Sequence, residues 1–336
     1  MQIEEHIKLD ALTTFHVAAK ARFFSRASTQ EDLNQSLDFA GSKDIFILGG
    51  GSNILLTRNF DGLVIRNEIG GIEVTHEDED HFYVKAGAGE NWHRFVQYCV
   101  AHGYAGIENL SLIPGNVGAS PMQNIGAYGV EIKDVFQELE ALHIRDRSIK
   151  KFTLEDCAFG YRESVFKGRY KNQFVITSVT YRLNKKPSFN TSYGAIQHEL
   201  ERMGVQELSI AAISQAVINI RSSKLPDPNE VGNAGSFFKN PVIPIELFER
   251  LKTEYPEIVA FPANQGQMKL AAGWLIERCG WKGYRNGDAG CYPRQALVLV
   301  NYGNATGKEI LELSQAIIDS VEKKFGVRLE REVNIL

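Results

Sequence analysis

The sequence predicts an α+β protein of two or three domains. Segments typical of β-strands and segments typical of helices follow one another without the strict strand–helix alternation of a doubly wound sheet. The chain has 336 residues, of which 43% are hydrophobic and 23% charged, as in ordinary soluble globular proteins. It contains no internal repeat and no low-complexity tract.

The first segment ends near residue 68. Its helix is expected to begin at "STQE", where Ser28 and Glu31 match a capping box. The stretch "DIFILGGGSNILLT" then has the pattern of a buried strand, a glycine turn and a second strand.

The second segment opens with an expected hairpin, in which "GIEVT" and "HFYVKAGAG" are strands and "HEDED" is the turn. A helix follows, capped by Asn91 and ended by Gly103. Residues 111–129 show little periodicity. The stretches "VFQELEALHI", "SIKKFTL" and "QFVITSVTYRL" are typical of strands in a larger sheet, and residues 209–221 have the pattern of a helix.

The third segment follows a linker, "SSKLPDPNE", marked by its two prolines and polar residues. Helices are expected near 244–254, 269–279 and 306–325, and the last opens with "TGKE", a second capping box. The stretches "ALVLVN" and "VRLEREVNI" are expected to be strands.

Charge and composition argue against several classes of partner. A net charge of -4 is unlike a broad nucleic-acid-binding surface. The first residues lack the pattern of a signal peptide and the apolar runs are too short to span a bilayer, so we expect a cytoplasmic protein without a membrane partner. The four cysteines form no C-x-x-C and the eight histidines show no ligand spacing, so no metal site is expected.

Familiar catalytic and nucleotide-binding motifs are absent. No G-x-G-x-x-G follows a strand, which disfavours a Rossmann site. The stretch "GNATGKE" is one residue too short between its glycines for a P-loop, and Glu309 stands where a Mg²⁺-binding hydroxyl should be. The stretch "AGSFF" lacks the G-x-S-x-G elbow of serine hydrolases.

Two glycine-rich stretches point to a ligand. "GGGSN" (49–53) follows an apolar strand, and "PGNVGASPMQNIGAYG" (114–129) is long and irregular. Successive glycine backbones present N–H groups that hold phosphates without a Rossmann motif. Together the stretches predict a cleft for a long ligand that carries a diphosphate.

Four other residues stand in stretches that allow both a structural and a chemical reading. Arg162 in "GYRES" fits a surface ion pair or a guanidinium that grips a carboxylate. Lys224 in "KLPDP" has the pattern of a solvated lysine, and Glu332 in "LEREV" would share a strand face with Glu330. Ser236 in "GNAGSFFKNP" could be a nucleophile, a proton donor, a phosphate contact or a turn residue, and the stretch alone favours the turn.

Eight motifs in order resemble one family, the UDP-N-acetylenolpyruvoylglucosamine reductases, also called UDP-N-acetylmuramate dehydrogenases. The motifs are "GGGSN", "IPGNVGASPMQNIGAYG", "GYRESVFK", "KLPDP", "GNAGSFFKNP", "KLAAGWLIE", "QALVLVN" and "LEREV", and they span essentially the whole chain. "SYG" (192–194) and the insertion "FPANQGQMKLAAG" resemble the type I branch.

The resemblance implies an FAD enzyme with the FAD-binding fold of the vanillyl-alcohol-oxidase type and a C-terminal α+β substrate domain. We expect a monomer. Residues 1–68 and 69–213 would form the two flavin subdomains and residues 214–336 the substrate domain, whose last strand could pack back on the flavin domains.

The implied reaction makes UDP-N-acetylmuramate, a precursor of cell-wall peptidoglycan. NADPH reduces FAD, and the reduced flavin gives a hydride to the CH₂ carbon of the enolpyruvyl ether. Arg162 and a protonated Glu332 match the family positions that stabilise the resulting enolate, and Ser236 matches the proton donor.

The resemblance also implies the binding residues. Tyr193, Lys224, Asn240, Phe261 and Gln295 match substrate positions, Phe261 standing where a tyrosine is common. The flavin cradle would comprise Gly49, Gly50, Gly51, Ser52, Asn53, Pro114, Gly115, Gly118, Ala119, Gln123, Asn124, Gly126, Ala127 and Gly129. An FAD oxidase that uses O₂, an acyl hydrolase built on Ser236 and a non-catalytic nucleotide-binding protein are the competing readings.

Overall fold

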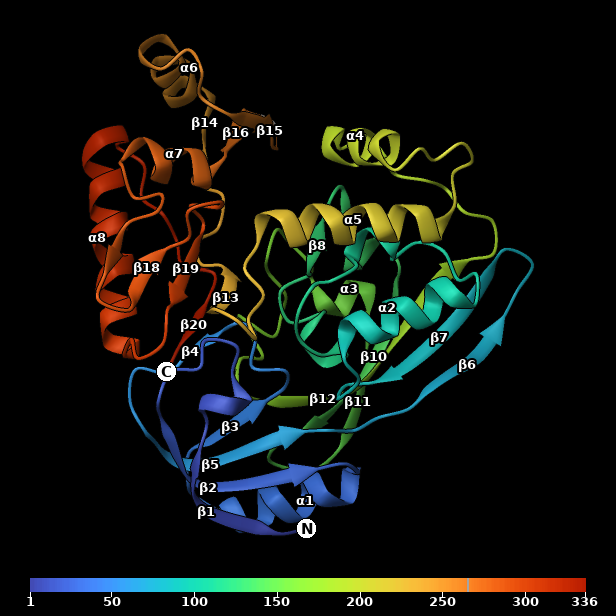
Figure 1. Ribbon diagram of the computed structural model, residues 1–336. Helices are drawn as coiled ribbons and strands as arrows, with labels where there is room; N and C mark the ends of the chain where they lie inside the picture. Colours follow the sequence, from blue (N-terminus) through green and yellow to red (C-terminus); the bar gives the residue numbers. More distant parts are fainter. Residues whose placement is uncertain (265) are drawn as a thin grey trace. The chain divides into compact units, whose positions relative to one another are not determined.

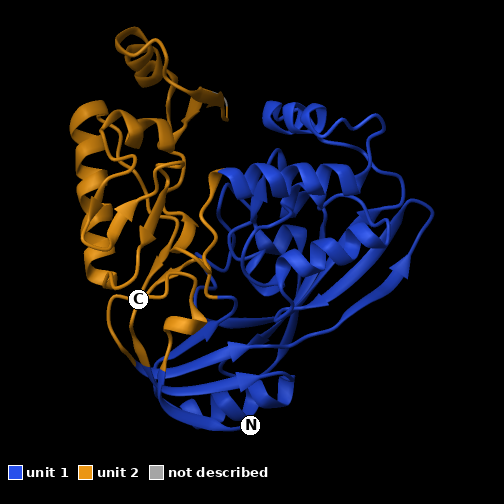
Figure 2. Ribbon diagram, viewed as in Figure 1, with its two compact units in different colours: residues 1–7, 21–50, 61–223 blue, residues 8–20, 51–60, 224–336 orange. Residues whose placement is uncertain are grey.

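The computed structural model describes residues 1–264 and 266–336 and has the mixed helix and strand content that the sequence predicts (Figure 1). The chain divides into two compact units (Figure 2). Unit 1 comprises residues 1–7, 21–50 and 61–223, and unit 2 comprises residues 8–20, 51–60 and 224–336. The three-domain division at 68/69 and 213/214 stays a prediction.

Unit 1 begins with a four-stranded sheet and one covering helix. The strand order is β1 (Ile3–Lys8), β2 (Lys20–Ala27), β5 (Phe60–Asn67) and β3 (Ile45–Leu48), and β3 runs parallel to β5. Helix α1 (Gln30–Ala40) covers one face (Figure 1), and its buried Leu33 and Leu37 share a core with Leu63 of β5.

The capping box of α1 is shifted by one residue from the predicted position. Thr29, not Ser28, is the N-cap, and its partner is Asp32, not Glu31. Thr29 Oγ1 accepts from the Asp32 N–H at 3.1 Å, and Asp32 Oδ2 accepts from the Thr29 N–H at 3.1 Å. Asp32 Oδ2 also accepts from the Ser28 N–H at 3.1 Å, so the Asp32 carboxylate satisfies the donors at this end of the helix.

The second sheet of unit 1 has five antiparallel strands, in the order β11 (Ile149–Thr153), β10 (Phe136–His143), β12 (Phe174–Asn184), β7 (His81–Gly87) and β6 (Ile72–Glu77). The predicted strands are confirmed, although β6 extends into the predicted turn. The turn is short because Asp78 Oδ1 accepts from the N–H groups of Asp80 and His81.

Helices α2 (Trp92–Ala101) and α3 (Leu154–Cys157) share a core with this second sheet, and α4 (Gly194–Arg202) and α5 (Ile210–Lys224) share a separate core with each other. Helix α2 is capped by Asn91 as predicted, since its Oδ1 accepts from the Arg94 N–H at 3.0 Å. Helix α5 runs three residues beyond its predicted end, so the linker begins only after Lys224.

Short elements shape the irregular run between α2 and β10. They are the 3₁₀ turns η2 (Glu108–Leu110), η3 (Val117–Ala119) and η4 (Ile132–Asp134), and the hairpin of β8 (Gly126–Ala127) with β9 (Val130–Glu131). A further 3₁₀ turn, η1 (Asp10–Leu12), belongs to unit 2.

Unit 2 contains a four-stranded and a three-stranded sheet. The first has the order β13 (Gly232–Ser236), β19 (Val298–Asn301), β18 (Ala289–Cys291) and β17 (Arg285–Asn286). The second has the order β14 (Val242–Pro244), β16 (Gln267–Leu270) and β15 (Ala260–Pro262). Gln265, inside the predicted type I insertion, lies outside the described residues.

Three helices complete unit 2: α6 (Ile245–Glu254), α7 (Ala272–Arg278) and α8 (Gly307–Phe325). The predicted box at "TGKE" is confirmed, since Thr306 caps α8 with Glu309 as its reciprocal partner. The helix expected from residue 269 begins only at Ala272, because the residues before it pair as β16.

The prediction of a strand along "VRLEREVNI" is largely wrong. Only β20 (Asn334–Ile335) is a strand, parallel to β4 (Ile54–Leu55), and Arg331 forms an isolated bridge with Phe238. The Lys239 N–H donates to Glu330 O and the Glu332 N–H donates to Phe237 O, both at 2.9 Å. The ladder ends there because the next donor would be residue 241, a proline without an N–H.

Candidate active site

Within unit 1, the structure brings Gly49 and Gly50 of the first glycine-rich loop against the second loop. A Cβ added at Gly50 would lie 2.7 Å from Gly115 Cα, and one at Gly49 would lie 3.9 Å from Asn116 Cβ. The first distance is shorter than side-chain carbons tolerate, so the close approach of the two backbones depends on glycine at position 50.

The second loop is anchored on β7 and α2. The N–H of Gly118 donates to Ala88 O at 2.9 Å, and a Cβ at Gly118 would lie 2.6 Å from Ala88 Cβ. Gly115 O accepts from the Trp92 N–H at 3.0 Å, and Trp92 is a fully buried residue of α2. The predicted cradle residues at the start of this loop therefore rest on rigid elements.

Asn124 holds the middle of the second loop. It is fully buried and has a left-handed backbone with φ 46°. Its Nδ2 donates to Glu131 Oε2 at 3.1 Å and to Gly160 O at 3.0 Å, and its Oδ1 accepts from the Lys133 N–H at 3.0 Å. Its amide therefore links the glycine loop to the hairpin that follows and to the "GYRES" segment.

The backbone of the first loop offers hydrogen-bond donors. Among the described residues, no hydrogen bond uses the N–H of Gly49, Gly50, Gly51 or Ser52. Consecutive N–H groups of this kind suit an anion such as a diphosphate. A cradle that a Cβ would fill, next to such donors, fits the diphosphate of a dinucleotide cofactor.

Arg162 lies against the second glycine loop. Its Nη2 donates to Gly126 O at 2.6 Å, and Nη1 donates to Asn124 O at 3.4 Å. The backbone of Arg162 is left-handed, with φ 54°, a strained conformation for a residue with a side chain. The second glycine loop therefore holds the Arg162 guanidinium in place. The sequence predicts that this guanidinium binds a carboxylate.

Tyr193 stands beside the same loop. It precedes α4, is 47% exposed, and packs edge to face on Tyr128 with ring centroids 5.4 Å apart. Its exposed ring is available for a ligand.

Ser236 ends β13 in unit 2 and is exposed. Gly235 before it has φ 67°, while Phe237 and Phe238 after it are 0% and 1% exposed. The Phe237 N–H donates to Leu297 O at 2.7 Å. The hydroxyl is therefore carried by a short segment whose far side is anchored in the core of unit 2.

Glu332 lies on the segment that is paired with the residues after Ser236. Its N–H bonds to Phe237 O, and its own carbonyl accepts from Asn53 Nδ2 at 3.3 Å. The neighbouring Lys239 is 8% exposed, and its Nζ lies 2.7 Å from Glu330 Oε1. Ser236 and Glu332 are thus close along hydrogen-bonded segments of unit 2, with a lysine–glutamate pair beside them.

Asn240 and Gln295 flank the first turn of α7. Asn240 Oδ1 accepts from the Ala272 N–H at 2.9 Å, and Gln295 Oε1 lies 3.0 Å from where a Cβ would stand on Gly273. Phe261 of β15 is 41% exposed, and Lys224 is an exposed residue at the end of α5. Within unit 2 the structure groups Asn240 with Gln295, and Ser236 with Glu332.

Sequence reasoning missed Arg221, a half-buried residue of α5 in unit 1. Its Nε donates to Leu112 O at 3.2 Å, at the start of the glycine loop. Burial lowers the pKa of its guanidinium. One arginine in an amphipathic helix gives no signal in a single sequence, because such residues normally face solvent.

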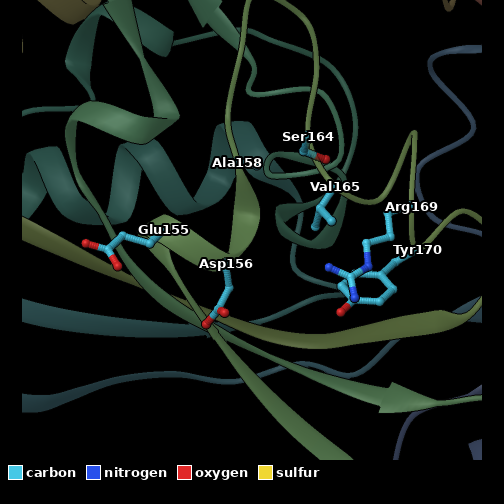
Figure 3. Close-up of a pocket in the computed structure, with 7 residues that line it drawn as sticks. All are labelled: Glu155, Asp156, Ala158, Ser164, Val165, Arg169 and Tyr170. Atoms are coloured by element: carbon cyan, nitrogen blue, oxygen red, sulfur yellow. The ribbon is translucent and has the colours of Figure 1, made fainter.

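A surface hollow of unit 1 is lined in part by Ser164, the last residue of the "GYRES" segment (Figure 3). It is lined by Glu155, Asp156, Ala158, Ser164, Val165, Arg169 and Tyr170, none of which was predicted as a site residue. Asp156 belongs to the capping box of α3 and Ser164 Oγ donates to Met122 O at 2.6 Å, so two of the polar liners already serve the fold.

The part of the chain that the structure describes holds no group of three His, Cys, Asp or Glu side chains arranged to bind a metal ion. Among its helices, none has the length and apolarity needed to cross a bilayer.

Comparisons with known proteins cover the whole chain. Residues 227–336 match the model of the "UDP-N-acetylenolpyruvoylglucosamine reductase, C-terminal domain", and residues 21–150 match that of an "FAD binding domain". The chain is 53% identical to the UDP-N-acetylenolpyruvoylglucosamine reductase of Amoebophilus asiaticus and 48% identical to that of Flavobacterium johnsoniae, covering 100% of both chains in each case. It also resembles the crystal structure of the reductase from Thermus caldophilus, with a TM-score of 0.68 and 26% identity over 100% of this chain and 99% of that one.

Proposed function

Because the chain belongs to the UDP-N-acetylenolpyruvoylglucosamine reductase family, we propose that it uses NADPH to reduce the enolpyruvyl ether of UDP-N-acetylglucosamine-enolpyruvate to UDP-N-acetylmuramate. It is an FAD-dependent oxidoreductase of peptidoglycan synthesis. The choice of NADPH, the roles of individual residues, a monomeric state and a cytoplasmic location are part of the proposal.

The meeting of the two glycine loops is the observation that carries the proposal. Gly50 and Gly115 are in backbone contact, and the N–H groups of residues 49–52 are available to an anion. FAD, when bound there, would carry electrons from NADPH to the substrate. The loop residues would hold its diphosphate and let its ring lie against the main chain.

Arg162 would bind the carboxylate of the enolpyruvyl group. Addition of a hydride to the CH₂ carbon places negative charge on the neighbouring carbon and its carboxylate, and a cation already in place stabilises that charge. The contact of Arg162 Nη2 with Gly126 O supports this role, because it fixes the guanidinium on the loop before the substrate arrives.

Ser236 would supply the proton that completes the reduction. Its hydroxyl is exposed on a segment anchored by Phe237 and Phe238, which suits a donor that must approach one face of the substrate. Glu332 would assist at the same carboxylate, since it follows the segment paired with Phe237.

The remaining predicted residues would bind the nucleotide part of the substrate. Tyr193 and Phe261 have exposed rings that can stack on a flat group, and Lys224 offers a charge for the diphosphate. Asn240 and Gln295 would contact the substrate from beside α7. With phenylalanine at position 261, stacking is kept and no hydroxyl contact is made there.

One anaerobic titration tests the proposal. The FAD absorbance of the purified protein should bleach on addition of NADPH and return on addition of the enolpyruvyl substrate. A protein recoloured by O₂ but not by that substrate would be an oxidase. A colourless protein that cannot be reconstituted with FAD would refute the proposal.

A further inference from the structure

Hydrogen bonds join the first turn of α2 to the start of the second glycine loop of unit 1. The Trp92 N–H donates to Gly115 O at 3.0 Å, from backbone to backbone. The next residue of α2 contributes its side chain instead, since His93 Nδ1 accepts from the Leu112 N–H at 3.0 Å. Of these two bonds, only the second can be removed by a proton, because a protonated ring nitrogen no longer accepts.

Leu112 makes a strained turn two residues before Pro114, where the glycine-rich stretch begins. Its backbone is left-handed, with φ 59°, a conformation that costs free energy in a residue with a side chain. Side chains hold both of its backbone polar groups: the N–H donates to His93, and the carbonyl accepts from Arg221 Nε of α5 at 3.2 Å. These two side chains therefore fix the direction in which the chain enters the loop.

The hydrogen bond to Leu112 also determines the protonation state of His93. A backbone N–H can only donate, so Nδ1 carries no proton and the ring proton is on Nε2. A doubly protonated ring would turn an N–H toward the N–H of Leu112 and would add a positive charge beside Arg221, which contacts the same residue. Burial and then the charge of Arg221 lower the pKa of His93 from its ordinary value of 6.5, which agrees with a neutral ring.

The acidic groups on the neighbouring elements bind backbone groups. Glu90, which precedes α2, and Glu108 of η2 accept from backbone N–H groups at 2.6 Å and 2.7 Å. Arg94, the next residue of α2, is exposed. The charge that acts on His93 is therefore that of Arg221, which opposes protonation of the ring.

We propose that His93 is a positioning residue for the FAD loop: in its neutral form, with the proton on Nε2, it holds the turn at Leu112, and protonation releases that turn. The inference rests on the proposed function where it assigns the second glycine loop to FAD. FAD then binds the protein with neutral His93, so FAD and the proton exclude each other. The affinity for FAD is fully present above the ordinary pKa of histidine and is lost as the pH falls below it.

Release of FAD from the holoenzyme tests the proposal. Dilution in a pH series, with the freed flavin measured by fluorescence, gives the Kd from about pH 8 to about pH 5.5. In the wild type the Kd should rise below about pH 6.5, by up to about tenfold per pH unit. In His93→Asn the amide oxygen can replace Nδ1 as acceptor but does not titrate, so the Kd should stay near its value at about pH 8 throughout.

Two further variants separate the lost bond from the proton. His93→Leu removes the acceptor and should raise the Kd on the order of tenfold at every pH, because the Leu112 N–H loses its partner. His102→Asn is the matched control: His102 follows the same helix, is exposed, and its Nδ1 lies 2.8 Å from Tyr98 O. It should keep the pH dependence of the wild type.

NMR of the holoenzyme with ¹⁵N-labelled histidine reads the tautomer directly. The His93 signals, assigned by their absence from His93→Asn, should show a bare Nδ1 and a protonated Nε2 at about pH 8. This readout requires neither NADPH nor substrate.

A wild-type Kd that stays constant down to about pH 5.5 would overturn the proposal, and so would an equal rise in His93→Asn or a proton on Nδ1 of His93. If His93→Leu does not fold, His93→Asn and the NMR spectrum decide without it. A holoenzyme that shows the pH dependence but is not reduced by NADPH would count against the proposed function only. A protein that binds no FAD at any pH would refute both.

Discussion

Gly50→Ala tests whether the two glycine loops must touch in order to hold FAD. The added carbon would lie 2.7 Å from Gly115 Cα and 2.8 Å from Asn116 Oδ1. The Asn116 side chain can turn away, but Gly115 Cα belongs to the backbone. Relaxed carbon–carbon contacts lie at about 3.5–4.0 Å, so the loops must separate by about 0.8 Å or more.

Overpacking of this kind costs about 1–3 kcal/mol. Unit 1 has about 200 residues, and in domains of that size each kcal/mol lowers Tm by about 2–4 °C. We therefore expect the Tm of the apoprotein to fall by roughly 2–12 °C. If about 1.4 kcal/mol of this cost destabilises the FAD-bound protein but not the apoprotein, the Kd for FAD rises about tenfold.

Thermal melting of the apoprotein and fluorescence titration with FAD measure both effects. Gly168→Ala is the control, because Gly168 is also in unit 1 and a Cβ there would meet no atom within 4 Å. An unchanged Tm and Kd for Gly50→Ala would refute the reasoning, since they would mean that the loops do not need this contact.

Three further outcomes are expected. Ser236→Ala should be reduced by NADPH at a near-normal rate but reoxidised by the enolpyruvyl substrate about 10²–10⁴-fold more slowly in stopped-flow measurements, and equal slowing of both halves would show a structural serine. Arg162→Lys should lower kcat as well as raise KM because lysine lacks the planar fork, whereas a raised KM alone would mean that Arg162 only positions the substrate. Burial raises the pKa of Cys157 and Cys291 to about 12 from an ordinary value of 9.0, so both thiols should resist alkylation at pH 8 in the native state. In the unfolded chain these thiols ionise above pH 9, whereas in the folded protein they stay protonated, so ionisation stabilises the unfolded state. The urea midpoint should therefore fall as the pH rises above 9. A constant midpoint up to pH 11 would contradict this.

The elements that were predicted correctly are those that depend on residues close together in the sequence. The cap of α2 at Asn91 and the reciprocal box of Thr306 with Glu309 depend on residues at most three apart, and the structure confirms both. The box at α1 shows the limit of this reasoning. Adjacent registers offer similar letters, so the sequence alone does not choose between them.

Elements that depend on distant partners were predicted less well. The alternation in "VRLEREVNI" is real, since Val327, Leu329 and Val333 are buried, but a strand also needs a neighbour that can donate. Pro241 removes that donor. A pattern along one segment contains no information about a proline some 90 residues away.

The candidate site divides in the same way. Both glycine loops could be predicted because small residues in an irregular run are visible in the sequence, although their contact at Gly50 and Gly115 could not. Ser236 was recognised only through the order of eight motifs, since its own stretch favoured a turn. Arg221 gave no signal, because its desolvation depends on where α5 packs.

The interleaving of the two units affects how the chain can fold while the ribosome makes it. Residues 8–20 and 51–60 are synthesised before residues 61–223 of unit 1, but they belong to unit 2, whose main part begins at Lys224. Within unit 2, Phe15 O accepts from Asn301 Nδ2 at 3.0 Å, and Ile54–Leu55 pair with Asn334–Ile335. At roughly 5–20 residues per second, translation from residue 60 to residue 224 takes about 8–33 s.

During that interval the apolar side chains of Phe15, Ile54 and Leu55 are exposed, because the residues that bury them in unit 2 have not yet been synthesised. Exposed apolar segments of this kind are bound by chaperones and cut by proteases. The last residues of the chain pair with some of the first, so a prematurely terminated chain keeps those apolar residues uncovered. A chain that stops before Asn301 therefore lacks the residues of unit 2 that pair with its N-terminal segments.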